Sequence, residues 1–139
     1  LFVQAGLELH VTEDPRRPIW NKLFVSAGIN PLTALARVPN GNIAANPALH
    51  RAARILLDEA VCVAKQQGYR FDAEQAFAHL LAVSRATASN RSSMLCDVEA
   101  GRQTEIESIN GAIARLGDAP ANALVAHLIR SLEAPGSDP

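Results

Sequence analysis

The chain has few cysteines, almost no net charge and no long apolar run. Cys62 and Cys96 are isolated, which favours reduced thiols in a cytoplasmic protein over a disulfide framework. A net charge of −1 argues against a nucleic-acid-binding surface. No apolar run approaches the roughly 18 residues that a membrane helix needs. The start, LFVQAGLELH, also lacks the basic leader of a signal peptide. We therefore expect neither nucleic acid nor membrane among its partners.

Several catalytic signatures are missing as well. No G-x-G-x-x-G follows a predicted strand, so the chain carries no dinucleotide fingerprint. The four histidines, at positions 10, 50, 79 and 127, do not have the spacing of metal ligands, and we predict no metal site. No Ser-His-Asp or Cys-His constellation can be argued from spacing. Because the chain does not start with Met, we expect it to be a piece of a longer protein.

What is present is a strong helical periodicity in a chain that is 48% apolar over 139 residues, enough for one domain with a sizeable core. The pattern predicts a compact all-α, multi-helix domain with at most one short N-terminal strand, at residues 7–11. The expected helices cover residues 18–37, 49–67, 72–88, 94–99, 104–116 and 120–132. A further helix tail is expected at residues 1–5.

Polar residues mark three of the predicted helix starts. Asp14 precedes Pro15, and Asp72 and Thr104 each open a capping-box pattern. In the last helix, the core face is predicted to comprise Leu124, Val125, Leu128, Ile129 and Leu132.

The stretch from Pro18 to Gly41 organises the chain. At about 100° per residue, Lys22, Ser26 and Asn30 fall on one face of a helix that is otherwise apolar. A lysine among apolar neighbours is costly unless its charge is paired or used, so this strip is predicted to form the wall of a polar pocket. Pro31 is expected to bend the helix, and Asn40 to project from a turn.

The strip belongs to the only candidate polar cluster. Its members are Lys22, Ser26, Asn30 and Asn40, joined by Ser93 and Glu105. The residues alone leave two interpretations open. The cluster is either a ligand site or a structural network that contains a buried Lys–Glu pair.

Two sequence blocks add a family resemblance. The first comprises W-x-K-L, N-P-L-T-A-L and P-N-G, and the second is S-S-M-L-x-D-x-x-x-x-R-x-T-E-I-x-x-I-N-G from Ser92 to Gly111. Both resemble the C-terminal domain of ketopantoate reductases (2-dehydropantoate 2-reductases). The resemblance implies a fold similar to the C-terminal domain of 6-phosphogluconate dehydrogenase. It also implies that residues 1–139 form the substrate-binding domain, with the N-terminal Rossmann domain for NADPH absent from this chain.

The resemblance also implies roles for the cluster. Lys22 stands at the family's catalytic lysine and would donate a proton to the substrate carbonyl. Glu105 would orient Lys22 and hydrogen-bond hydroxyl groups of the substrate or the cofactor. The remaining positions would bind the substrate's carboxylate and hydroxyl groups: Ser26, Asn30, Asn40 and Ser93. Ser26 departs from the family, which often has Asn there, and this bears on the identity of the substrate.

The resulting hypothesis is an oxidoreductase domain of pantothenate biosynthesis. The parent enzyme would reduce 2-dehydropantoate to pantoate with NADPH in the cytoplasm, and the isolated domain should be catalytically silent. Two alternatives stay open: the domain of a paralogous enzyme that reduces another 2-keto acid, and a non-catalytic helical module that forms a homodimer.

Overall fold

The computed structural model describes residues 14–133, and every regular element in that range is helical. The elements are α1 (Arg16–Ala36), α2 (Asn42–Ala45), α3 (Pro47–Gln66), α4 (Ala73–Ala86), α5 (Ser93–Glu99), the 3₁₀ turn η2 (Ile106–Ser108), α6 (Asn110–Leu116) and α7 (Pro120–Leu132). The all-α prediction is confirmed. The strand expected at residues 7–11 and the helix tail at residues 1–5 lie outside the described residues.

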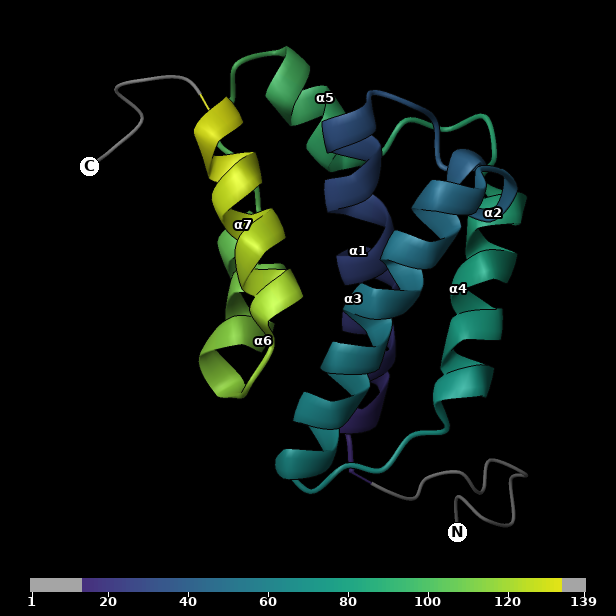
Figure 1. Cartoon of the computed structure of the whole chain (residues 1–139), viewed down its shortest axis with the longest axis vertical. Coiled ribbons are helices and arrows are strands. Elements are labelled where there is room, and N and C mark those ends of the chain that lie inside the picture. The colour runs from purple at the N-terminus through teal and green to yellow at the C-terminus, as the bar shows by residue number, and fades with distance from the viewer. Residues whose placement is uncertain (1–13, 134–139) are drawn as a thin grey trace, which may run out of the picture.

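Helix α1 is the central element of the domain. It packs against α3, α4, α5 and α7, and in Figure 1 it stands between α7 and α4 with α3 in front of it. Trp20, Phe24 and Ala27 are buried along its core side. The ring of Phe24 meets that of Phe71 edge-on, with the centroids 4.9 Å apart. Because α1 touches most other helices, its one polar face is held in a defined position.

Helix α1 runs through Pro31 to Ala36, although a proline inside a helix removes one hydrogen-bond donor. The carbonyl oxygen of Ala27, four residues earlier, therefore lacks its usual partner. The side-chain amide of Asn110, from α6, donates to this oxygen at 3.1 Å. A residue 83 positions away in the chain thus replaces the hydrogen bond that Pro31 removes.

Asn110 belongs to a buried polar network that links four helices. Its amide also donates to Oδ1 of Asn122 in α7 at 2.9 Å. The amide of Asn122 donates to the Leu56 carbonyl and to Oε2 of Glu59 in α3. The Glu59 carboxylate in turn accepts the backbone N–H groups of Ala121 and Asn122. This carboxylate satisfies the otherwise free donors at the start of α7.

The predicted helix starts are only partly observed. Asp72 accepts the N–H of Gln75 and caps α4, as predicted. Thr104 accepts the N–H of Ile106, but only η2 follows it, and α6 begins at Asn110. The expected continuous helix over residues 104–116 is therefore wrong. The N–H of Thr104 is bound by Glu133 rather than by Glu107, the partner expected in a capping box.

The predicted core face of α7 also needs correction. Val125 and Ile129 are buried, but Leu124, Leu128 and Leu132 are 58%, 43% and 38% exposed. The neighbours of α7 cover the side that carries Asn122, Val125, Ala126 and Ile129. The three leucines, at intervals of one turn, form a second apolar stripe that faces away from this core.

Within residues 14–133, no helix is long and apolar enough to cross a membrane. The same residues contain no group of three or more metal-ligating side chains.

Candidate functional site

Lys22, Ser26 and Asn30 lie at intervals of one turn along α1. Ser26 and Asn30 are half-buried, and Lys22 is exposed. The core side of α1, with Trp20 and Phe24, is turned away from this strip. The expectation that apolar side chains enclose Lys22 is therefore wrong, because its ammonium group is accessible at the surface of the domain.

The C-terminal half of the strip meets the start of α5. The hydroxyl of Thr33 hydrogen-bonds the Ser92 hydroxyl at 2.8 Å and lies 3.1 Å from the Asn30 carbonyl oxygen. Ser92 caps α5 by accepting the N–H of Leu95, and the next residue, Ser93, is exposed. The fold therefore brings Asn30 and Ser93, 63 positions apart by their residue numbers, to the same region.

Asn40 lies in a turn, as predicted, but its side chain packs against α4. Its amide nitrogen donates to the Thr87 hydroxyl at 3.0 Å, and its backbone N–H donates to the Asn90 carbonyl. Its backbone carbonyl accepts the Ser84 hydroxyl at 2.7 Å. The Oδ1 atom of Asn40 is buried without a hydrogen-bond partner among the described residues. Because this oxygen is itself buried, the Asn40 side chain is held inside the domain and is not presented at its surface.

Glu105 is exposed and lies directly before η2. Its carbonyl oxygen accepts from the N–H and the hydroxyl of Ser108. In the part of the chain that the structure describes, no ion pair joins Glu105 to Lys22. The alternative of a buried Lys–Glu pair is therefore wrong for this domain, since both side chains are exposed.

Lys22 stands at the edge of a groove between α1 and α4. The two helices come close at Gly28, where an added Cβ atom would clash with Cδ1 of Leu80. Towards the N-terminal end of α1, a cavity of about 440 Å³ opens between this helix and the middle of α4. Its lining comprises Pro18, Asn21, Lys22, Val25, His79 and Val83. The Lys22 ammonium thus adjoins a cavity with a largely apolar wall.

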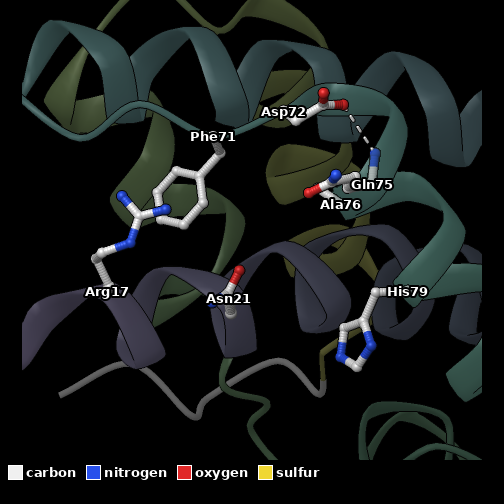
Figure 2. A pocket seen from close by; sticks show the side chains of 7 residues that line it. All are labelled: Arg17, Asn21, Phe71, Asp72, Gln75, Ala76 and His79. Carbon is white, nitrogen blue, oxygen red and sulfur yellow. Dashed lines mark hydrogen bonds between the residues drawn. The ribbon is translucent and has the colours of Figure 1, made fainter. Parts of the chain in front are cut away.

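A second cavity, of about 330 Å³, continues the groove and shares Asn21 and His79 with the first. Figure 2 shows Arg17 and Asn21 rising from α1 towards the segment that contains Phe71 and Gln75. The Arg17 guanidinium lies over the Phe71 ring, with Cζ 4.2 Å from the centroid, and Nη1 donates to the Arg70 carbonyl at 3.0 Å. His79 reaches from α4 back towards α1.

His79, Asn21 and Arg17 are absent from the residues that sequence reasoning selected. The only sequence signal is spacing: Arg17, Asn21 and Val25 recur every four residues on α1. Gln75, His79 and Val83 recur in the same way on α4. Nothing in the sequence says that these two stripes face each other across a groove, so the signal becomes useful only with the tertiary structure.

Fold and groove together define an all-α domain with a lysine-bearing cleft between two helices. The family model described as "Ketopantoate reductase PanE/ApbA C terminal" matches residues 14–133. The chain therefore belongs to this family of ketopantoate reductase C-terminal domains.

Individual relatives agree with the family match. A 2-dehydropantoate 2-reductase of Archaeoglobus fulgidus is 42% identical over 134 residues, which cover 93% of this chain and 45% of that protein. The crystal structure of a PanE/ApbA family ketopantoate reductase from Ralstonia eutropha aligns with a TM-score of 0.79 and 26% identity, over 94% of this chain and 45% of that one. A dimeric ketopantoate reductase from Staphylococcus aureus aligns with a TM-score of 0.78 and 26% identity, over 88% and 44% of the two chains. The chain thus spans about half the length of the relatives that it matches.

Proposed function

We propose that this chain is the C-terminal, substrate-binding half of an NADPH-dependent 2-dehydropantoate 2-reductase. The other half of the parent protein would be a Rossmann domain that holds the cofactor. The family match and the relatives named as 2-dehydropantoate 2-reductases support this assignment. The single observation that carries it is the exposed Lys22 ammonium at the wall of the α1/α4 groove.

The chemistry of reducing a 2-oxo acid suits this lysine. When bound, NADPH supplies the hydride that adds to the carbonyl carbon. Lys22 would donate a proton from Nζ to the carbonyl oxygen, so that the developing alkoxide becomes a hydroxyl group. Before transfer, the same ammonium would polarise the carbonyl by hydrogen bonding to its oxygen. An exposed lysine at a groove is placed to reach such a substrate.

The polar residues beyond Lys22 would hold the rest of the substrate. Ser26, Asn30 and Ser93 offer hydroxyl and amide groups for a carboxylate or a hydroxyl, without a fixed counter-charge. Asn40 joins this set through the family resemblance alone, since its amide nitrogen bonds Thr87 and its Oδ1 is buried. Ser26 is shorter than the Asn that the family often has, so a paralogous reductase with another 2-keto acid as substrate is the nearest alternative.

On the cofactor side, this chain offers little. Glu105 is an exposed carboxylate that could hydrogen-bond hydroxyl groups of the cofactor or the substrate. The described residues present no glycine-rich turn that leads from a strand into a helix, as a pyrophosphate cradle requires. The proposal therefore assigns most of the NADPH contacts to the other half of the parent protein, and this chain alone should not oxidise NADPH.

A specific observation also favours an assembly role. The exposed stripe of Leu124, Leu128 and Leu132 on α7 is an apolar surface without a partner among the described residues. One relative is described as dimeric. A homodimer through this helix is compatible with the enzymatic proposal. It would remain the proposed role of the domain if the parent protein has no reductase activity.

The test compares wild type with Lys22→Ala in the full-length parent, assayed as NADPH oxidation with 2-dehydropantoate. We expect a loss of turnover of about 10²- to 10⁴-fold, the usual contribution of a general acid. The matched control is Lys65→Ala, which removes the exposed lysine near the end of α3. It should keep full activity.

Full activity in Lys22→Ala would contradict the proton-donor role of Lys22. A parent that reduces a different 2-oxo acid would keep the mechanism and change the substrate. If no parent protein with a cofactor domain reduces any 2-oxo acid, the assembly role becomes the proposed function.

A further inference from the structure

The second cavity of the α1/α4 groove has the composition of a ligand subsite that the proposed roles of Lys22, Ser26, Asn30, Asn40 and Ser93 leave unused. It is contiguous with the Lys22 cavity, because Asn21 and His79 line both. Its α1 residues, Arg17 and Asn21, precede Lys22 along the helix, whereas Asn30 follows Lys22, so the cavity lies towards the N-terminal end of α1. A ligand held at Lys22 could therefore extend in this direction as well.

Arg17 is preorganised in this cavity. Its guanidinium stacks on Phe71 and donates one N–H group to the Arg70 carbonyl. A guanidinium has five N–H donors in a rigid plane, so most of them remain for a ligand. Holding the plane against an aromatic ring lowers the entropy that the side chain loses on binding. Such a fixed fork of donors matches the oxygen atoms of a carboxylate or a phosphate.

The other groups in the cavity complement an anion. Asn21, Gln75 and His79 each have a side chain that can donate an N–H group. Asp72 is the one carboxylate in the lining, and its Oδ1 accepts the backbone N–H of Gln75 at 3.0 Å. Together, the linings of the two adjoining cavities contain two cationic side chains, Arg17 and Lys22, and this single carboxylate. The groove is therefore positive even with neutral His79.

We propose that this cavity is a binding site for anionic oxygen groups, with Arg17 as the principal ligand-binding residue and Asn21 and His79 as supporting donors. The bound group is a carboxylate or a phosphate. Its two sources would be an acidic substrate held at Lys22 and the phosphates of a nucleotide cofactor. Only this choice of source rests on the proposed function, since the site itself stands on the geometry of the groove.

The site can be tested by NMR titration of the 139-residue chain at constant ionic strength, with chloride as the balancing anion. Two probes distinguish the sources: inorganic phosphate, and 2-oxoisovalerate as a small 2-oxo carboxylate. We expect saturable shifts of the amide signals of Arg17, Asn21 and residues 71–79 with at least one probe. Saturation by phosphate alone points to the cofactor, and saturation by 2-oxoisovalerate points to the substrate.

Variants separate the site from general attraction to a charged surface. Arg17→Gln should weaken binding at least 10-fold, whereas Arg51→Gln, which removes an exposed arginine of α3, should leave it unchanged. Asn21→Asp alters an exposed side chain and places a second carboxylate in the cavity. It should abolish binding while the spectrum stays folded, which keeps the test valid if Arg17→Gln is destabilised.

Two outcomes would overturn the proposal: no saturable shift with either probe, or equal loss of binding in Arg17→Gln and Arg51→Gln. Failure of the proposed function looks different. A parent without 2-oxo acid reductase activity, whose isolated chain still binds anions through Arg17, would refute the enzyme assignment and leave this site intact.

Discussion

At the scale of single residues, the least expected role belongs to Asn110. It is fully buried, its amide bonds both Ala27 and Asn122, and its Oδ1 has no partner among the described residues. An asparagine in such surroundings is unfavourable unless its hydrogen bonds are needed. The need arises at Pro31, whose missing N–H leaves the Ala27 carbonyl open.

This relation predicts a coupling between Asn110 and Pro31. Asn110→Ala should lower the free energy of unfolding by about 1–3 kcal/mol, because the Ala27 carbonyl and Asn122 lose their partner. In a Pro31→Ala background, the new N–H can bond the Ala27 carbonyl, so the cost of Asn110→Ala should fall by about 1 kcal/mol. Urea unfolding of the four variants measures this coupling.

The matched control for the cycle is Asp72→Ala, which removes the cap of α4. The Asp72 carboxylate bonds Gln75, outside the Asn110 network, so the cost of its removal should be the same in wild type and in the Pro31→Ala background. If Asn110→Ala lowers the free energy of unfolding equally in wild type and in the Pro31→Ala background, the proposed replacement of the hydrogen bond is contradicted.

A second residue-scale prediction concerns Asp14 and pH. The backbone N–H of Arg16, and then the Tyr69 hydroxyl, hydrogen-bond its carboxylate and lower the pKa of Asp14 below its ordinary 3.8. A carboxyl whose folded pKa is lowered stabilises the fold fully above its unfolded pKa. That stabilisation is lost as the pH falls through the folded pKa.

The stability of wild type relative to Asp14→Asn should therefore be constant above about pH 5 and shrink below about pH 4. Thermal unfolding of both proteins across this range gives the difference directly, and an NMR titration of the Asp14 carboxyl gives its pKa. A difference that does not change with pH would show that the carboxylate charge is irrelevant.

At the scale of elements, α7 shows how a helix with two apolar sides is oriented by its neighbours. Its sequence places leucines every four residues on one side, and Val125, Ala126 and Ile129 on another. The hydrogen bonds of Asn122 with Asn110 and Glu59 orient the side of α7 that carries Asn122 towards the core. The leucine stripe is consequently left outside the core.

This orientation predicts unequal costs for two adjacent residues. Ile129 is fully buried, so Ile129→Ala should cost about 2–5 kcal/mol of unfolding free energy. Leu128 is 43% exposed, so Leu128→Ala should change stability by no more than about 0.5 kcal/mol. Chemical denaturation of both variants measures the contrast. Similar losses in dilute solution would indicate that the leucine stripe is covered, and sedimentation would show whether a second copy covers it.

At the scale of the whole molecule, Glu59 joins the two sides of the domain. It lies on α3, bonds two backbone N–H groups of α7 at 2.8 and 2.9 Å, and holds the Asn122 amide at 2.8 Å. Through Asn122 and Asn110 the same chain of hydrogen bonds reaches α1. The two sides of the domain should therefore unfold together.

Glu59→Ala should lower the free energy of unfolding by about 1–3 kcal/mol, because buried donors lose their acceptor. Glu59→Gln keeps one oxygen acceptor and should lose less. The fluorescence of Trp20, the only tryptophan, reports on α1, and far-ultraviolet circular dichroism reports on all helices. The two transitions should coincide in wild type and separate most in Glu59→Ala. Separate transitions already in wild type would show that the network does not couple the helices.

The positions of most helices, the Asp72 cap and the polar strip on α1 were predictable from sequence, because each depends on spacing along one segment. The motifs around Lys22 and from Ser92 to Gly111 likewise indicated the family. The break between Thr104 and Asn110 was not predictable, since a tertiary contact from Glu133 takes the N–H that a capping box would use.

The sequence by itself therefore determined that this is an all-α domain with a lysine on a polar helix face. Only the tertiary structure decided that Lys22 is open to a groove, that His79 and Arg17 share that groove, and that the α7 leucines face outward. The reason is that periodicity describes one helix at a time. Which face of a helix is covered depends on neighbours that are distant in the chain, such as α4 across from α1 at Gly28 and Leu80.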